Sequence, residues 1–202
     1  LKTKRTQHSV KELQSLGIQP DIIVLRAEHE LNEGLRKKVA SFCNVDFNAV
    51  VQSIDLPTIY EVPLSMQAQG LDSTILRKMG IEPGETPGLG PWRAFLERRH
   101  KATEVVNIGL VGKYDLQDAY KSILESLSQA GTYNDRKVVP CFINSEKLFN
   151  NNVEEKLKDM DGVIICPGFG QRGIEGKFIA LKYAREHDIP TFGECLGMQC
   201  MV

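Results

Sequence analysis

At 202 residues the chain is long enough for one large or two modest domains. Charged residues make up 25% of it and the formal net charge is -1 at pH 7, which excludes a basic surface field for nonspecific binding of nucleic acid. No apolar run approaches the roughly 20 residues that span a bilayer, and the first residues contain no apolar signal-peptide core, so the sequence predicts a soluble protein.

The first 80 or so residues carry helix and strand signals in alternation. Periodic apolar positions predict helices at residues 9–16 and 30–42, and β-branched runs predict strands at residues 21–25 and 49–54. Residues 58–79 are helical in pattern, with Pro63 expected to kink or split the helix. This part of the chain indicates the end of a parallel α/β sheet.

A stretch dense in proline and glycine follows at residues 82–91 and predicts a domain linker. Together with a helix expected at residues 92–101, it gives a linker at 81–103 between a first domain, 1–80, and a second, 104–202. Beyond the linker we expect strands at 105–111, 137–144, 162–166 and 189–193, and helices at 119–129, 153–158 and 175–186. The alternation predicts an α/β fold with an open, doubly wound parallel sheet.

One cysteine lies at a sharp bend between the last expected strand and a helix start, in the sequence Gly193-Glu194-Cys195-Leu196-Gly197. Such an elbow exposes a nucleophile on a strained turn, and the positive helix end favours thiolate over thiol. Ligands bind beyond the carboxyl ends of parallel strands, where the glycine loop after residues 162–166 also arrives. We expect the amides of Gly168 and Leu196 to stabilise an oxyanion there. The motif alone also allows a buried structural cysteine.

The other cysteines and the histidines limit the chemistry. Five scattered cysteines without C-x-x-C spacing argue against a disulfide framework and a zinc site, and they fit a reducing cytoplasm. Of the four histidines only His187 lies well inside the second domain, and about eight extended residues at roughly 3.3 Å each separate it from Cys195 by about 26 Å. The base that a cysteine nucleophile needs is therefore expected outside this chain, which we expect to be a segment of a longer protein.

Basic residues at the N-terminus suggest an anion site. Three cations and three hydrogen-bonding side chains stand just before the first expected helix, in the order Lys2-Thr3-Lys4-Arg5-Thr6-Gln7. Ammonium and guanidinium groups suit phosphate oxygens, whereas hydroxyl and amide groups can select a sugar or base. A second cluster, Arg36-Lys37-Lys38, could close on the same ligand. For each cluster a solvated charged face is the alternative.

Taken in order, these segments resemble the CTP synthase family over essentially the whole chain. Besides the basic hexapeptide and the elbow, the matching pieces are Gly112-Lys113-Tyr114, Asp118-Ala119-Tyr120-Lys121-Ser122 and Phe169-Gly170-Gln171-Arg172-Gly173-Ile174-Glu175-Gly176. The resemblance implies the end of a parallel-sheet, P-loop-type amidoligase (synthetase) domain. After the linker it implies the first part of a flavodoxin-like class I glutamine amidotransferase domain.

The resemblance also implies roles for individual residues. Cys195 would be the glutaminase nucleophile, and the glutamine and oxyanion contacts would come from Gly168, Leu196, Gly197, Met198 and Gln199. UTP and the inhibitor CTP would bind Lys2, Thr3, Lys4, Arg5, Thr6, Gln7 and Lys38. ATP would contact Ile54, Asp55 and Leu56, and the activator GTP would contact Arg172 and Glu175.

For the full enzyme the resemblance implies an allosteric ligase of pyrimidine biosynthesis that aminates UTP to CTP with ATP, Mg²⁺ and ammonia from glutamine. It further implies a cytoplasmic homo-oligomer, a tetramer, with no nucleic-acid or membrane partner. The family's phosphate loop, Mg²⁺ ligands and triad histidine and glutamate have no counterpart in this sequence, so we expect the segment alone to hold no metal and to have neither activity.

Two other interpretations stay open at this point. One is a cysteine hydrolase or thiol-redox protein of the same amidotransferase-like fold, which predicts thiol reactivity without a response to UTP or CTP. The other is a nucleotide-sensing assembly module with a vestigial Cys195. It predicts CTP binding and self-association without glutamine turnover.

Overall fold

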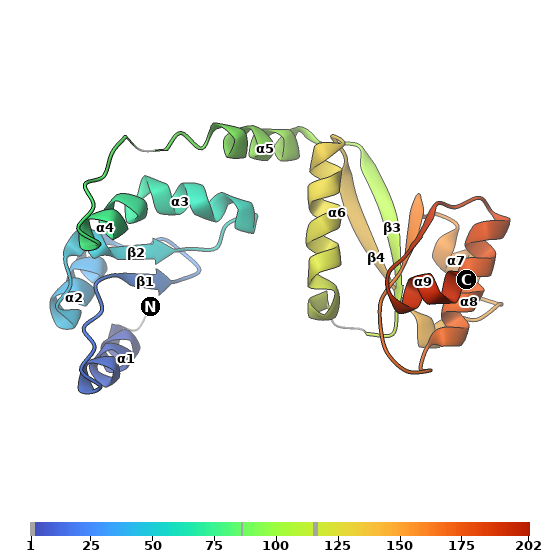
Figure 1. Ribbon diagram of the computed structural model, residues 1–202, viewed down its shortest axis with the longest axis horizontal. Coiled ribbons are helices and arrows are strands. Elements are labelled where there is room, and N and C mark those ends of the chain that lie inside the picture. Colours follow the sequence, from blue (N-terminus) through green and yellow to red (C-terminus); the bar gives the residue numbers. More distant parts are fainter. Residues whose placement is uncertain (1–2, 86, 115–116) are drawn as a thin grey trace. The chain divides into compact units, whose positions relative to one another are not determined.

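The computed structural model describes residues 3–85, 87–114 and 117–202 (Figure 1). They form two compact units, Leu1–Trp92 and Arg93–Val202, and the division falls inside the segment expected to be the linker. Within the described residues no helix combines the length and the apolar character needed to cross a bilayer.

The first unit is built on two parallel strands, β1 (Ile23–Arg26) and β2 (Val50–Ser53), with Ile23 paired to Val50. Helices α1 (Thr3–Ser15) and α2 (Glu33–Cys43) pack on them, and a short turn of 3₁₀ helix, η1 (Phe47–Ala49), leads into β2. Asn32 caps α2 by accepting a hydrogen bond from the Leu35 amide at 2.8 Å. The shared core consists of Val10, Ile23, Leu25, Val39, Ala40, Cys43 and Val50.

The helical stretch after β2 is split into three pieces. It comprises η2 (Ile59–Glu61), α3 (Val62–Ala68) and α4 (Leu71–Lys78). Pro63 stands in the first turn of α3, directly after η2 ends, so the helical stretch is split beside this residue, as one of the two expected outcomes had it. Proline fits this position because its missing N–H would have no helical partner. A second interruption lies at Gly70, whose φ of +72° suits glycine and ends the helical path of α3.

The second unit contains a four-stranded parallel sheet in the order β4-β3-β5-β6. In chain order its elements are α5 (Gly90–Lys101, which spans the division), β3 (Val105–Gly112), η3 (Gln117–Tyr120), α6 (Lys121–Tyr133), β4 (Lys137–Asn144), η4 (Ser145–Lys147), α7 (Val153–Leu157), β5 (Gly162–Ile165), α8 (Ile174–Glu186), β6 (Thr191–Gly193) and α9 (Leu196–Met201). Counted within the unit, the strand order is 2-1-3-4, that of flavodoxin-like doubly wound sheets. The predicted α/β class is confirmed.

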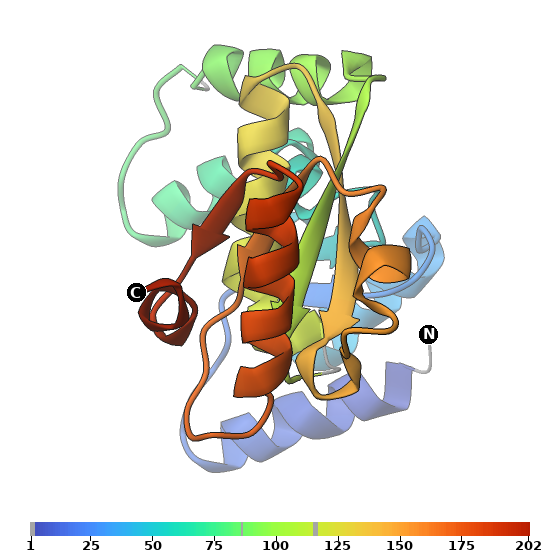
Figure 2. The same cartoon turned by 90° about the vertical axis from the view of Figure 1, so that its right-hand side faces the viewer.

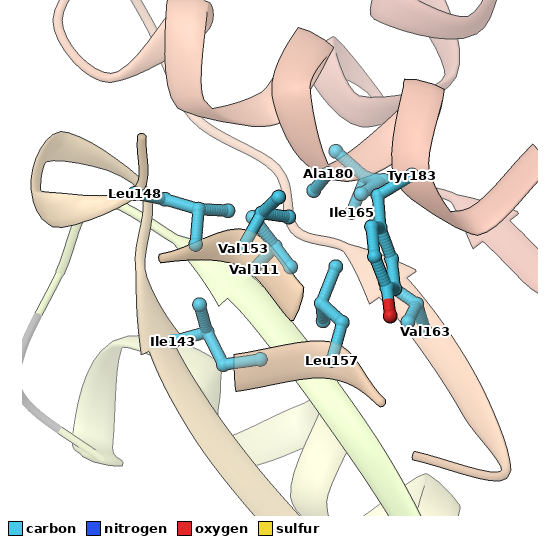
Figure 3. Packing of buried hydrophobic residues seen from close by; sticks show 9 residues of the cluster. All are labelled: Val111, Ile143, Leu148, Val153, Leu157, Val163, Ile165, Ala180 and Tyr183. Atoms are coloured by element: carbon cyan, nitrogen blue, oxygen red, sulfur yellow. The ribbon is translucent and has the colours of Figure 1, made fainter. Parts of the chain in front are cut away.

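Helices cover both faces of this sheet, because alternate residues of each strand point to opposite sides. Figure 2 shows α8 on one side of the strands and α6 on the other. The α7 and α8 face buries Val111, Ile143, Leu148, Val153, Leu157, Val163, Ile165, Ala180 and Tyr183 (Figure 3). The α6 face buries Leu110, Tyr120, Ile123 and Cys166.

The packing of α8 predicts that replacing Gly176 by alanine destabilises the protein, whereas helix propensity alone would predict the opposite. A Cβ at Gly176 would stand 1.8 Å from the backbone oxygen of Ser145, so Gly176→Ala should lower the free energy of unfolding by about 1–3 kcal/mol. Gly34 in α2 meets nothing closer than 3.5 Å, so Gly34→Ala is the matched control and should gain about 0.4–1 kcal/mol. Denaturant titration of the intact protein measures both. Equal effects of the two substitutions would contradict the close approach of α8 to η4.

Candidate active site

The predicted elbow is present at the end of β6. Cys195 immediately precedes α9, its side chain is exposed, and its backbone has φ 52° and ψ −112°. Residues other than glycine rarely adopt positive φ, so the surrounding structure must hold this conformation. Hydrogen bonds on both sides do so: the Glu194 amide donates to Ile165 O at 3.1 Å, and the Gln199 amide donates to Cys195 O at 3.0 Å.

The two glycines of the elbow allow backbone to pass within contact distance. A Cβ at Gly197 would lie 1.9 Å from Ile165 O, and a Cβ at Gly193 would lie 2.6 Å from the amide nitrogen of Met198. Neither contact can be relieved by a side-chain rotation, because the opposing atoms belong to the backbone. The spacing of glycines around Cys195 therefore follows from how closely α9 packs on β5 and β6.

Three turns meet at this edge of the sheet, those after β3, β5 and β6. A Cβ at Gly168 would lie 3.3 Å from Lys113 Cε and 3.7 Å from Leu196 Cδ2, so the loop after β5 lies between them. Lys113 is a buried residue, and its ammonium donates a hydrogen bond to Phe169 O. The structure thus brings the Gly168 loop beside the first residue of α9.

Some backbone N–H groups of the site already donate a hydrogen bond to a backbone oxygen, and others do not. Gly197 donates to Glu194 O at 2.8 Å and Gln199 donates to Cys195 O, so neither amide is available to a substrate. Among the described residues, Gly168 and Leu196 donate to no backbone oxygen. These were the two expected oxyanion donors, whereas Met198 and Gln199 offer exposed side chains.

Cys195 is exposed, whereas Cys166 and Cys43 are buried, and this difference affects which thiol can react. Burial raises the pKa of Cys166 to about 12, so that thiol stays protonated at neutral pH. Burial also raises the pKa of Cys43. Since the thiolate is the nucleophile, both buried thiols are poor candidates, while Cys195 is exposed at a helix start.

Lys177 is the site residue that sequence reasoning missed. It lies on α8, is fully buried, and donates to Cys166 O at 2.6 Å. A lysine is normally assigned to the solvent face of a helix. The available signal was its spacing, because Lys177, Ala180 and Ala184 share one face of α8 and all three are buried.

His187 lies where the sequence placed it, at the C-terminal end of α8 and before β6. Its ring stacks on Tyr183 with 3.9 Å between ring centroids, and its Nδ1 lies 2.9 Å from Tyr183 O. It is exposed and caps a helix end, which leaves it no part in the elbow.

The two residues expected to meet GTP lie between β5 and the first turn of α8. The Arg172 guanidinium pairs with the Glu146 carboxylate of η4 at 3.2 Å and lies 6.0 Å from the centre of the Tyr114 ring. Glu175 is exposed in the first turn of α8. Arg172 therefore has protein partners already.

The basic segment of the first unit is helical. Lys2 lies outside the described residues, and Thr3 to Gln7 form the first turns of α1, so our expectation that this segment precedes the helix is wrong. Lys, Arg and Gln are good helix formers, and nothing between them and residue 9 breaks a helix. Because α1 and α2 share one core, the two basic clusters stand on helices that pack together.

Within the second basic cluster the three side chains differ. Arg36 donates to Val50 O at 2.8 and 3.1 Å, and Lys37 pairs with Glu33 at 2.5 Å. In the part of the chain that the structure describes, Lys38, Lys4 and Arg5 are exposed and form no ion pair. These three remain free to bind an anion.

The segment expected to contact ATP follows the carboxyl end of β2. Asp55 accepts a hydrogen bond from Arg26, the last residue of the neighbouring β1, while Ile54 and Leu56 are half-buried. No group of three or more His, Cys, Asp or Glu side chains among residues 3–85, 87–114 and 117–202 could hold a metal ion.

The backbone at Cys195 gives a prediction about stability. Glycine adopts a φ of +52° without strain, so Cys195→Gly should raise the free energy of unfolding of the second unit by about 1 kcal/mol or more relative to Cys195→Ala. Thermal or denaturant unfolding of the two variants of the intact protein makes the comparison. If the alanine variant is the more stable of the two, the strain at the elbow is absent.

Two family models match the chain. One, described as "CTP synthase N-terminus", matches residues 1–81, and the other, "Glutamine amidotransferase class-I", matches residues 115–202. A structure described as the Trypanosoma brucei CTPS glutaminase domain with bound acivicin is 37% identical, with a TM-score of 0.44 over 48% of this chain and 39% of that one.

Curated relatives match over the full length of the chain. The CTP synthases of Bacteroides thetaiotaomicron, Porphyromonas gingivalis strain W83 and Flavobacterium johnsoniae are 77%, 63% and 55% identical over all of this chain. The chain spans 38% of the length of each of these relatives. Both family models and the full-length matches agree: the chain belongs to the CTP synthase family.

Proposed function

We propose that the protein containing this chain is a CTP synthase, in which Cys195 hydrolyses glutamine and the released ammonia converts UTP to CTP. The observation that carries the proposal is the strained, exposed Cys195 with two free amides, of Gly168 and Leu196, at one sheet edge. High identity to curated CTP synthases along the whole chain supports it.

In the glutaminase reaction the Cys195 thiolate attacks the side-chain amide carbon of glutamine. Negative charge develops on the amide oxygen, and the Gly168 and Leu196 N–H groups stabilise it. Ammonia leaves with a proton and a γ-glutamyl thioester remains, which water hydrolyses to glutamate and free thiol. The base is a residue outside this chain, since His187 lies at the opposite end of β6.

In the synthetase reaction ATP phosphorylates the 4-oxygen of UTP, and ammonia then displaces phosphate to give CTP. Exposed basic groups of α1 and α2, Lys4, Arg5 and Lys38, hold the nucleotide triphosphate, with Thr3, Thr6 and Gln7 beside them. Ile54, Asp55 and Leu56 contact ATP at the end of β2. Ammonia passes between the two sites in a path closed to water, because in bulk water it would be protonated.

The proposal extends to regulation and assembly. GTP activates the enzyme through Arg172 and Glu175, which stand before and within the first turn of α8. CTP inhibits at the UTP site. The working enzyme is a cytoplasmic homotetramer that uses ATP with Mg²⁺ held by residues outside this chain.

The proposal that glutamine hydrolysis and CTP formation take place at separate sites is tested by Cys195→Ala in the intact protein. Glutamine-dependent CTP formation should fall by about a thousandfold or more, because no other described thiol is exposed at a helix start, while ammonia-dependent formation should persist. Cys141→Ala, a thiol on β4, is the matched control and should spare both. Loss of both activities in Cys195→Ala refutes the proposal, and so does retention of both.

The nucleotide site is tested by Lys38→Ala with Lys37→Ala as its control. Lys38 has no ion-pair partner among the described residues, so its loss should raise the KM for UTP and the CTP concentration for half-inhibition by about tenfold. Lys37 is engaged by Glu33, so its loss should leave both unchanged. Steady-state kinetics at saturating ATP and ammonia measure the effect. A larger effect from Lys37→Ala contradicts the assignment.

A further inference from the structure

The outer edge of β2 carries backbone groups that no strand satisfies. In the part of the first unit that the structure describes, β2 pairs with β1 and with no other strand. Ser53 O accepts a hydrogen bond from the Ala27 amide, just beyond the end of β1, at 3.1 Å. Successive residues of a strand direct their N–H and C=O groups to opposite edges, so those of Gln52 face away from β1. Gln52 is buried, and both groups therefore need another partner.

The side chain of Gln69 satisfies both groups with one primary amide. Its Oε1 accepts from the Gln52 amide at 2.9 Å, and its Nε2 donates to Gln52 O at 2.8 Å. The same Nε2, which carries two hydrogens, also donates to Ser65 O in α3 at 3.1 Å. A neighbouring strand would offer Gln52 this pair of bonds. The half-buried Gln69, at the C-terminal end of α3, thus completes the edge of the sheet.

Gln52 is also held through its own side chain. Its Oε1 accepts from the Leu31 amide, in the loop ahead of α2, at 2.8 Å, and the whole residue is only 8% exposed. Buried hydrogen bonds that share one residue make its position rigid. The end of β2 is therefore fixed by contacts with α3 on one side and with the loop before α2 on another.

This fixed point stands directly before the segment that is expected to contact ATP. Residues 54–56 follow Gln52 after a single intervening position, and they belong to no helix or strand. The polypeptide then returns through η2 and α3 to Gln69, so the bonds between the two glutamines close a loop that contains residues 54–56. On the β1 side, Asp55 accepts a hydrogen bond from Arg26. The placement of this irregular segment depends on the contacts at its ends.

We propose that Gln69 is a positioning residue of the ATP site, whose side-chain amide replaces a strand neighbour of Gln52 and so holds residues 54–56 where they contact ATP. This inference rests on the proposed function, in which these residues bind ATP for the synthetase reaction. Gln69 acts through the backbone of β2 and does not touch the nucleotide.

The first test is Gln69→Met in the intact protein, with ammonia as the nitrogen donor. Methionine keeps the length of the side chain and removes both its donor and its acceptor. The KM for ATP should rise about tenfold, because residues 54–56 lose their fixed position. The kcat and the KM for UTP should stay within about twofold of the unmodified protein. A merely structural role would lower kcat and raise both KM values together.

Two further variants complete the kinetic design. Gln67→Met is the matched control, because Gln67 lies on the same helix and donates to Pro87 O at 3.0 Å, away from residues 54–56. It should leave both KM values unchanged. Gln69→Glu is nearly isosteric, but it loses the donor and places a carboxylate oxygen against Gln52 O. It should raise the KM for ATP at least as much, and it carries the test if the methionine variant does not fold.

Hydrogen exchange gives a readout that does not depend on activity. Without nucleotide, peptides that cover residues 53–58 should exchange about tenfold faster in Gln69→Met and at the unmodified rate in Gln67→Met. The inference is overturned if this exchange is unchanged, if the KM for ATP stays within about twofold in both Gln69 variants, or if the KM values for ATP and UTP rise equally. An unmodified protein that forms no CTP from UTP, ATP and ammonia contradicts the proposed function, whereas an active unmodified protein with unaffected Gln69 variants contradicts this inference alone.

Discussion

The close approach of Gly197 to the carbonyl oxygen of Ile165 determines the backbone conformation and the exposure of Cys195. A single Cβ at this position would stand 1.9 Å from that oxygen, so α9 can pack on the end of β5 only if residue 197 is glycine. The chain must then turn from β6 into α9 within Glu194 and Cys195, and the Glu194 amide is bound to the same carbonyl. The positive φ of Cys195 is the consequence of this geometry. Exposure of the thiol thus follows from backbone packing.

Charge inside the domain complements that geometry. Lys113 and Lys177 are both buried, and each donates to a carbonyl of the loop after β5, so the loop's own dipoles compensate part of the desolvation of the two ammonium groups. The same environment that holds these cations suppresses ionisation of Cys166. Neighbouring thiols therefore differ in reactivity because of burial, while the sequence shows only identical residue types.

The sequence was sufficient for the fold class and for the elbow, because β-branched runs and glycine turns are local signals. It predicted each strand of the second unit to within a few residues, and the order 2-1-3-4 followed the expected doubly wound pattern. Its errors have one local and one tertiary cause. Thr3 to Gln7, expected before the first helix, lie within α1, because good helix formers extend the helix toward the N-terminus. Lys177 was missed because a lysine is normally assigned to the solvent face of a helix, although its spacing with Ala180 and Ala184 placed it on the face that packing buries.

One rule of parallel sheets accounts for where the candidate residues of both units lie. In the first unit Asp55 follows β2 and contacts Arg26 at the end of β1, and in the second unit Lys113, Gly168 and Cys195 follow β3, β5 and β6. Carboxyl ends of parallel strands gather at one edge, so residues far apart in sequence arrive together without a dedicated element to align them. His187, by contrast, precedes β6, so it lies at the opposite edge of the sheet, where it caps the C-terminal end of α8. A proton acceptor for Cys195 must therefore approach from the same edge as the Gly168 loop.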